Sequence, residues 1–278
     1  MPEENVMKLL WETEQEILDV IHKVCTEHGL RYSLGYGTLL GAVRHGGFIP
    51  WDDDIDIIMP REDYEELLKI WSDAAPEGYL LQNVRTNPDF SQSFTKIRKD
   101  HTTFLESKEE SFKNYHKGIF VDIFPGDRVA GKGCGRTLQY IAGAVHLLYN
   151  RGFTSGTGGI IGLVERVLLS APKKKYAPRR VKAENYLRRW NGDEKLQYFF
   201  PCTIGECRLY YPADLFNNLK TVAFNGKMYM CVANPDEVLR CGYGDYMQLP
   251  PEEERVWKHH PIIIDFEHNY EELEGNEP

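Results

Sequence analysis

Residues 35–59 read GYGTLLGAVRHGGFIPWDDDIDIIM, and this stretch decides the fold of the chain. It begins with a glycine turn at Gly37, continues with an apolar run typical of a short helix capped by Thr38, and ends in alternating acids and isoleucines typical of a half-buried strand. A glycine turn that opens a helix exposes backbone N–H groups at the positive helix end, where phosphate binds well. The order of these elements predicts an α/β core with a phosphate site beside an acidic strand.

The acidic strand predicts a metal site. Side chains two residues apart in a strand share a face, so we expect Asp52, Asp54 and Asp56 to project together. Ile55 and Ile57 are then expected to enter the core. Three carboxylates on one face repel one another unless a cation lies between them, and oxygen ligands without cysteine favour Mg²⁺, with Mn²⁺ as the alternative. An acidic run can also be a solvated turn, but the interleaved isoleucines favour a half-buried strand.

A third acid lies in KGIFVDIFPGD, residues 117–127. Asp122 stands in a strongly apolar strand, where an unpaired carboxylate would cost several kcal/mol. If that strand lies beside the first acidic strand, Asp122 is expected to bind the metal or to accept the proton of an attacking hydroxyl. The alternative is a structural acid paired with a basic residue.

The remaining sequence predicts a mixed, α/β (α+β) molecule with a helical lobe and a C-terminal β-hairpin. The hairpin signal is Asn225-Gly226 between two strand-like runs, which suits a type I′ turn. We expect a catalytic core over about 1–130, a helical lobe with a basic segment over 131–200, and a hairpin and tail completing the core over 201–278. Further strands are expected at 78–84, 92–98 and 118–124, and helices at 6–28, 61–73, 137–150 and 159–170.

The distribution of charge along the chain indicates which kinds of partner it can bind. A formal net charge of −9 argues against general nucleic-acid binding, yet residues 173–189 hold eight Lys or Arg against one Glu. This segment follows the apolar stretch GIIGLVERVLLSAP, so a peripheral contact with an anionic membrane is expected. The alternative is a solvated helix face. The expected basic contacts are Lys173, Lys174, Lys175, Arg179 and Arg180.

The location expected from the sequence is cytoplasmic, with peripheral contact at the inner face of the membrane. The six cysteines are scattered without a CxxC pair, and the first residues show no signal-peptide pattern. No run reaches the eighteen apolar residues that a membrane span requires.

Three blocks of sequence resemble a known family. A glycine turn, a short helix, an Asp-x-Asp strand and a later acid resemble the polymerase-β-type nucleotidyltransferase superfamily. More specifically, GTLLGAVRHGGFIPWDDDIDIIMPREDYE, GIFVDIFPGD (118–127) and YGDYMQLPPEEERVWKHH (243–260) resemble the LicD family. The blocks occur in the expected order and span most of residues 31–260, so the resemblance predicts a nucleotidyltransferase-type core.

The resemblance also implies an activity. LicD-like proteins move phosphocholine from CDP-choline to a sugar hydroxyl of a bacterial cell-surface glycan, such as teichoic acid or lipopolysaccharide, and release CMP; related proteins move ribitol phosphate. A lipid-linked glycan is one expected form of the acceptor. By the family pattern, Asp54 and Asp56 hold metal, Asp122 is the third carboxylate, and Gly37 and Thr38 form the phosphate turn.

Other residues are weaker candidates for substrate binding. Lys96 and Arg98 match a basic spot in the family and are candidates for holding the diphosphate. A choline headgroup needs aromatic faces, and Trp51 is one of several aromatic residues in the three blocks. His45 is a candidate phosphate contact.

Two other functions fit the same residues. One is a true nucleotidyltransferase that acts on a small molecule or a protein. The other is a catalytically inactive glycan-binding module, although the intact acids Asp54, Asp56 and Asp122 weigh against it.

Overall fold

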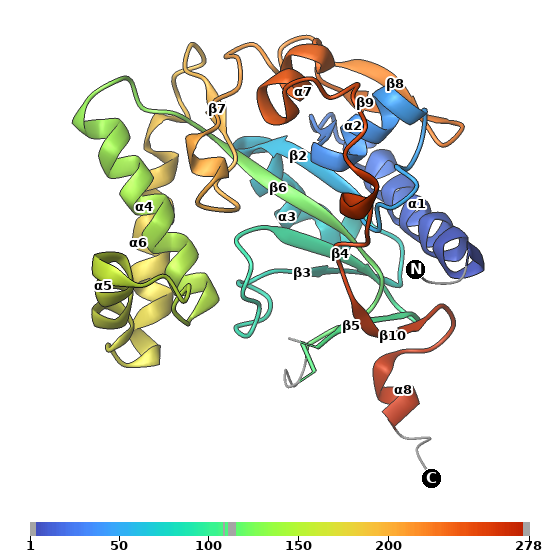
Figure 1. Cartoon of the computed structure of the whole chain (residues 1–278), viewed down its shortest axis with the longest axis horizontal. Helices are drawn as coiled ribbons and strands as arrows, with labels where there is room; N and C mark the ends of the chain where they lie inside the picture. Colours follow the sequence, from blue (N-terminus) through green and yellow to red (C-terminus); the bar gives the residue numbers. More distant parts are fainter. Residues whose placement is uncertain (1–3, 108, 111–114, 275–278) are drawn as a thin grey trace.

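The chain folds as a mixed α/β molecule with a helical lobe to one side of a central sheet (Figure 1). The computed structural model describes residues 4–107, 109–110 and 115–274. Its helices are α1 (Glu4–Glu27), α2 (Tyr36–His45), α3 (Arg61–Ala74), α4 (Cys134–Arg151), α5 (Gly159–Leu169), α6 (Tyr176–Leu187), α7 (Pro235–Tyr243) and α8 (Tyr270–Glu274). Its strands are β1 (Ser33–Leu34), β2 (Asp56–Pro60), β3 (Tyr79–Gln82), β4 (Thr95–Lys99), β5 (Thr103–Glu106), β6 (Phe120–Arg128), β7 (Tyr198–Phe199), β8 (Lys220–Phe224), β9 (Lys227–Cys231) and β10 (Pro261–Asp265).

The central sheet has the strand order β1-β2-β6-β4-β3, and β7 pairs with the end of β6. Strands β2 and β6 run parallel, whereas β1 pairs with β2, and β4 with β6 and β3, in the antiparallel sense. The predicted mixed sheet is therefore confirmed. Its parallel pair lies in the middle and sets Asp56 opposite Asp122 in register.

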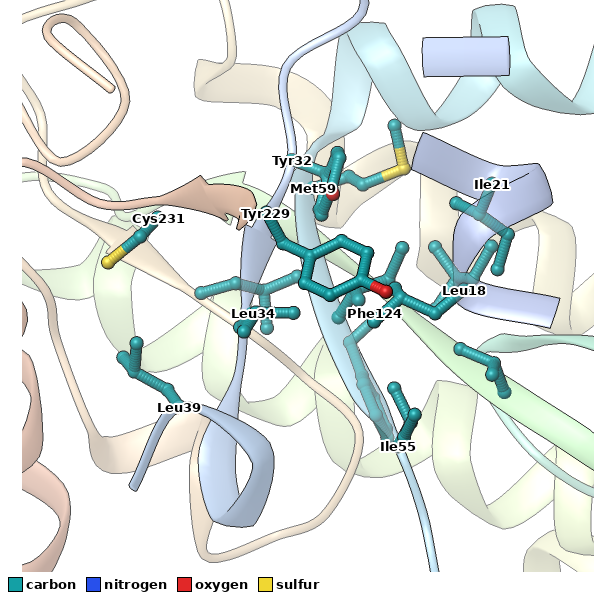
Figure 2. Close-up of a cluster of buried hydrophobic side chains, with 14 of the residues drawn as sticks. Leu18, Ile21, Tyr32, Leu34, Leu39, Ile55, Met59, Phe124, Tyr229 and Cys231 are labelled. Carbon is teal, nitrogen blue, oxygen red and sulfur yellow. The ribbon is translucent and has the colours of Figure 1, made fainter. Parts of the chain in front are cut away.

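One apolar core joins the sheet, α1 and the hairpin. In Figure 2, Leu18 of α1, Leu34 of β1 and Tyr229 of the hairpin belong to the same cluster of buried side chains. Ile55 and Ile57 are fully buried, as predicted. Burial of this surface holds α1 and the hairpin against the sheet.

The predicted hairpin is confirmed as β8 and β9. Its turn residues Asn225 and Gly226 have φ values of 47° and 82°, the left-handed backbone that a type I′ turn needs. The Asn225 N–H donates to the carbonyl of Gly46 at 2.9 Å. The turn therefore supports the loop that follows α2, which carries the acidic residues.

An ion-pair network fastens the lobe to the sheet. The guanidinium of Arg61, at the start of α3, lies 2.6 Å from Asp127 on β6 and 3.4 Å from Glu184 on α6. Figure 1 shows α4 and α6 alongside each other in the lobe, with α5 across their ends. The lobe is thus tied to the strand that carries Asp122.

The structure differs from the sequence predictions in three places. The helix after the glycine turn begins at Tyr36, and its N-cap is Gly35 rather than Thr38. The strand expected to include Asp52 and Asp54 begins only at Asp56, so both acids lie in the preceding loop. The antiparallel pair β5–β10 was not predicted, because its two strands are separated by more than 150 residues of sequence.

Candidate active site

A loop and the start of a strand, rather than alternation along one strand, bring the acidic residues together. Asp52, Asp53 and Asp54 lie in the loop before β2, and each offers a carboxylate oxygen within 4.8 Å of the others. Asp56 is the first residue of β2. The prediction that strand alternation would place Asp52, Asp54 and Asp56 on one face is therefore wrong for the first two. The predicted accumulation of carboxylates is nevertheless present.

Asp122 is the third residue of β6 and is paired with Lys96 of β4. The Lys96 ammonium donates to both carboxylate oxygens of Asp122, at 2.8 and 3.0 Å, and both side chains are buried. The ammonium also lies 3.1 Å from the ring centroid of Phe120. Lys96 was expected to contact the diphosphate, and the structure instead places it against the third acid. This contact matches the alternative expected from the sequence, in which Asp122 is a structural acid paired with a basic residue.

A segment from the far end of the chain supplies further charges to the site. The backbone N–H of His259 donates to Asp53 Oδ2 at 3.0 Å, and its Nδ1 lies 3.3 Å from Asp53 Oδ1. Lys258 Nζ lies 3.7 Å from Asp52 Oδ1. Two hundred residues separate these partners in sequence, so Lys258 was missed as a site residue. The only sequence signal for it was its place in the block 243–260.

Burial and mutual repulsion change the pKa values of the acids. Burial, and then the charge of Asp54, raise the pKa of Asp52 to about 7, while the nearby Lys258 opposes the rise. Burial first, then Asp54 and Asp122, hold the pKa of Asp56 well above its usual range. The pKa of Asp54 is raised by burial, although His259 and Lys258 oppose the shift. The site therefore favours a bound cation or proton among its carboxylates.

The pKa values of the two lysines beside the acids, Lys96 and Lys258, shift in opposite directions. Burial lowers the pKa of Lys96 in spite of Asp122, and burial raises the pKa of Asp122 in spite of Lys96. For Lys258, burial works against the charged form, but the charges of Asp52 and Asp54 prevail and raise its pKa. Lys258 therefore keeps its ammonium beside the acids, whereas burial disfavours the charged forms of both Lys96 and Asp122.

A sixth acid, Glu14 of α1, lies beside this cluster. It is buried, its Oε2 has no hydrogen-bond partner among the described residues, and burial, followed by the charge of Asp54, raises its pKa. Sequence reasoning missed Glu14, because a single acid in an amphipathic helix gives no signal of where it points. It adds to the negative charge that a cation here would offset.

The glycine turn has a steric role. A Cβ on Gly37 would lie 2.4 Å from Asp52 Oδ2, so only glycine admits the carboxylate at this distance. Thr38 Oγ1 accepts a hydrogen bond from the backbone N–H of Asp56 at 2.8 Å. The backbone N–H of Gly35 donates to the carbonyl of Asp56 at 2.9 Å. The turn thus fixes the start of β2 and the position of the acids.

Arg98 and His45, two further predicted substrate contacts, lie outside the carboxylate cluster. Arg98 is fully buried, and its guanidinium donates to Gln82, to the carbonyl of Gly118 and to Glu109. It holds neighbouring segments together, and its positive charge, like that of Lys96, works against the raised pKa of Asp122. His45 is exposed at the end of α2, with its ring 6.3 Å from that of Trp51, and does not line the pocket described next.

A pocket of about 560 Å³ opens beside the acids. Asp52, Lys258 and Gly37 belong to its wall, which joins it to the carboxylate cluster. The rest of the lining also comes from α2, from the loop before β2 and from residues 243–254. The side chains that could recognise a ligand there are aromatic, acidic and basic: Trp51, Tyr243, Tyr246, Asp245, Glu254 and Arg44.

The described residues fit a hard divalent cation. The Asp52, Asp53 and Asp54 set offers only carboxylate oxygens, which Mg²⁺ and Mn²⁺ prefer. Asp53 also bonds to His259, which leaves Asp52 and Asp54 as the freer ligands. Asp56 and Asp122 lie side by side across the parallel strand pair, next to these two.

Fold and site together define a nucleotidyltransferase-type transferase, with an acidic cluster at the end of a parallel strand pair. Comparison with known families agrees: residues 29–133 match the model of the LicD/FKTN/FKRP nucleotidyltransferase domain. The chain is 30% identical over 274 residues to the lipopolysaccharide cholinephosphotransferase LicD of Haemophilus influenzae, covering 91% of this chain and 97% of that protein. The chain belongs to the LicD family.

Other relatives match a shorter part of the chain. The ribitol 5-phosphate transferases FKRP of human and mouse are each 42% identical over 57 residues, which is 20% of this chain and 11% of theirs. Membership of the family places the chain among transferases. The resemblance noted in the sequence is confirmed at the level of the family.

Proposed function

We propose that this protein transfers phosphocholine from a CDP-activated donor to a sugar hydroxyl of a lipopolysaccharide-type glycan and releases CMP. The observation that carries the proposal is the pocket whose wall includes Asp52 and Lys258, because it places a hollow with aromatic lining directly beside the carboxylate cluster. The family relative named for cholinephosphate transfer to lipopolysaccharide supports the same substrates. Teichoic acid is an alternative acceptor of the same chemistry.

In this proposal Asp54 and Asp56, with Asp52, hold Mg²⁺ or Mn²⁺. The cation supplies positive charge that offsets the diphosphate of the donor. Lys258, whose ammonium is kept charged by the acids, binds a phosphate oxygen at the pocket wall. Lys258 takes this role in place of Arg98, whose guanidinium is fully buried and bonded to Gln82, Gly118 and Glu109. Gly37 leaves room for the Asp52 carboxylate, and Thr38 fixes the backbone of Asp56.

Asp122 accepts the proton of the attacking hydroxyl. Its raised pKa makes it a stronger base than an exposed aspartate, and the ammonium of Lys96 stabilises its charged form between turnovers. The hydroxyl oxygen then forms a bond to the phosphorus that carries choline, and the bond from that phosphorus to CMP breaks. Positioning and charge stabilisation carry most of such a transfer.

The pocket suits a quaternary ammonium group. Such a group makes no hydrogen bonds and binds to aromatic faces, with nearby carboxylates adding attraction. Trp51, Tyr243 and Tyr246 supply the faces, and Asp245 and Glu254 supply the charge. The face of Trp51 already lies 5.4 Å from the guanidinium of Arg255, so it accepts a cation in the present structure.

The experiment is a donor screen with CDP-choline, CDP-ribitol and CDP-glycerol, with product analysis. The proposal expects free CMP and a phosphodiester product from CDP-choline. Pyrophosphate or a nucleotidylated product would show a true nucleotidyltransferase instead. Glycan binding without turnover of any donor would show a glycan-binding module.

A single substitution tests the choline pocket. Tyr243→Leu should raise KM for CDP-choline by about 3- to 30-fold, the range expected for loss of one cation–π contact. KM for CDP-glycerol, which carries no cation, should change little. Equal changes for the two donors would place choline elsewhere.

A further inference from the structure

Helix α5 turns its apolar face to solvent, which is the reverse of a surface helix in a globular protein. Its exposed residues are Ile160, Ile161, Leu163, Val164 and Val167, with 81% of Ile160 and 63% of Val167 accessible. On a helix of 3.6 residues per turn these five span roughly 160°. A continuous exposed apolar face of this kind marks an interaction surface.

Glu165, the acidic residue of α5, does not lie on that face. Glu165 accepts hydrogen bonds from the guanidinium of Arg151 at 3.0 Å and from the backbone N–H of Ser155 at 2.8 Å. On the same inner side, a Cβ on Gly162 would lie 2.0 Å from the carbonyl oxygen of Thr157, so the helix packs tightly there. The exposed face of α5 therefore carries no negative charge.

Positive charge lies immediately beside the apolar face. Lys173, Lys174 and Lys175 form a single helical turn shortly after α5, and all three are exposed. Arg179 is different from these lysines, because its guanidinium donates to the hydroxyl of Tyr149 at 2.6 Å and to the carbonyl of Leu168. Arg180 is half-buried, and burial lowers its pKa. The five-residue basic cluster expected from the sequence therefore reduces to three lysines.

An apolar groove extends the surface. It has a volume of about 750 Å³ and shares Val167 with the exposed face of α5. Leu138, Ile141 and Val145 of α4 line it, and Lys175 and Lys182 belong to its wall. Apolar lining next to lysine ammonium groups matches the two chemistries of an anionic lipid, an acyl chain and a phosphate.

We propose that these five apolar residues of α5, together with Lys173–Lys175, form a docking surface for an anionic lipid bilayer. The chain as a whole is acidic, with a net charge of −9, so this cationic region is where approach to an anionic surface is attractive. The apolar side chains then enter the acyl boundary while the lysines contact lipid phosphates. None of the described helices has the length and apolar content of a membrane span.

The test is co-sedimentation of the full chain with phosphatidylcholine vesicles that either contain or lack phosphatidylglycerol, at low and high salt. Binding is expected only to the anionic vesicles, and it should weaken steeply with salt. The variant K173Q/K174Q/K175Q should lose roughly five-fold in affinity per lysine, on the order of 100-fold in all. The variant I160S/I161S/V164S should lose at least about ten-fold.

Control variants change exposed lysines and exposed apolar residues outside the docking surface. K8Q/K23Q/K69Q removes three exposed lysines, and L9S/L80S removes two exposed leucines, so both variants should bind like the wild type. Circular dichroism and melting temperatures establish that each variant is folded. Vesicle binding needs no turnover, so its result is independent of the proposed activity.

Two results would overturn the proposal. In the first, the wild type fails to sediment with anionic vesicles even at low salt. In the second, sedimentation equilibrium shows a dimer that I160S/I161S/V164S abolishes while no variant changes vesicle binding, which would assign the face to a second copy of the chain.

Discussion

The ammonium nitrogen of Lys96 lies 2.8 and 3.0 Å from the two carboxylate oxygens of Asp122, and both side chains are buried in the sheet. The contact joins β4 to β6 at the point where Asp122 faces Asp56. It serves both as a structural pair and as part of the proposed site. Substitutions can separate these two roles.

Removing one partner of the pair should destabilise the fold by about 3–5 kcal/mol, because the other charge remains buried without compensation. Asp122→Asn and Lys96→Met are therefore both expected to lower the melting temperature. The double variant K96M/D122N should recover part of that loss without recovering CMP release. If CMP release by Asp122→Asn falls only in proportion to its folded fraction, Asp122 is a structural acid alone.

Substitutions of Asp54 and of its neighbour Asp53 are expected to have different effects. Asp54→Asn should abolish turnover and leave the melting temperature without metal unchanged or higher, since it removes carboxylate repulsion. Asp53→Asn should cost about 1–3 kcal/mol of stability, because asparagine keeps only one of the two acceptor oxygens with which Asp53 contacts the N–H and Nδ1 of His259. Thermal melts in EDTA and a CMP-release assay compare the two. Normal turnover by Asp54→Asn would rule out its metal role.

Asp52 predicts a pH dependence of stability. Its pKa is about 7 in the folded protein, against about 4 in an unfolded chain, so between these values the folded state holds more protons. The free energy of unfolding should therefore fall as pH rises from about 4 to about 7, by at most about 4 kcal/mol from this group. Melts of the wild type and Asp52→Asn in EDTA should show a shallower fall in the variant. Parallel curves would show that Asp52 does not titrate in this window.

Magnesium should reverse this trend. A cation among the carboxylates favours their charged forms, so added Mg²⁺ should raise the melting temperature more above pH 7 than at pH 5. The same titration of the Asp54→Asn variant provides the control. An equal effect of Mg²⁺ on both proteins would place the cation at another site.

The close approach of Gly37 to Asp52 predicts that a side chain at position 37 lowers activity more than stability. Gly37→Ala would place a Cβ 2.4 Å from the Asp52 carboxylate oxygen, which must then move. Because that oxygen is the end of a side chain, we expect a small change in melting temperature and a loss of about 10- to 100-fold in kcat, as for misplaced catalytic groups. Gly192→Ala, which meets nothing within 4 Å, is the control. Full activity of Gly37→Ala would show that Asp52 is free to relocate.

Local sequence signals predicted much of this fold. The Asn225-Gly226 turn, the acidic start of α3 and the apolar period of α1 each depend on neighbouring residues only, and each prediction is confirmed. The accumulation of acids around Asp54 was also predictable, because three aspartates in succession are visible in the sequence.

Long-range contacts were not predictable in the same way. The burial of Arg98 depends on Gln82, Glu109 and the Gly118 carbonyl, which come from three other segments. The arrival of Lys258 beside Asp52 depends on the pairing of β10 with β5, and no periodicity reports such a pairing. The bend that keeps Asp54 out of β2 depends on how the loop packs rather than on its alternating pattern.

The contact between residues 258–259 and Asp52–Asp53 has a consequence for synthesis on the ribosome. A chain that has emerged only as far as β6 already contains the acids of the site and the strand pair that carries Asp56 and Asp122. The ammonium of Lys258 and the backbone N–H of His259 join them only after more than a hundred further residues have been made. Until then Asp52 and Asp53 lack these two partners and the pocket lacks the lining that residues 243–258 supply, so premature termination before residue 258 should yield a polypeptide that cannot bind donor.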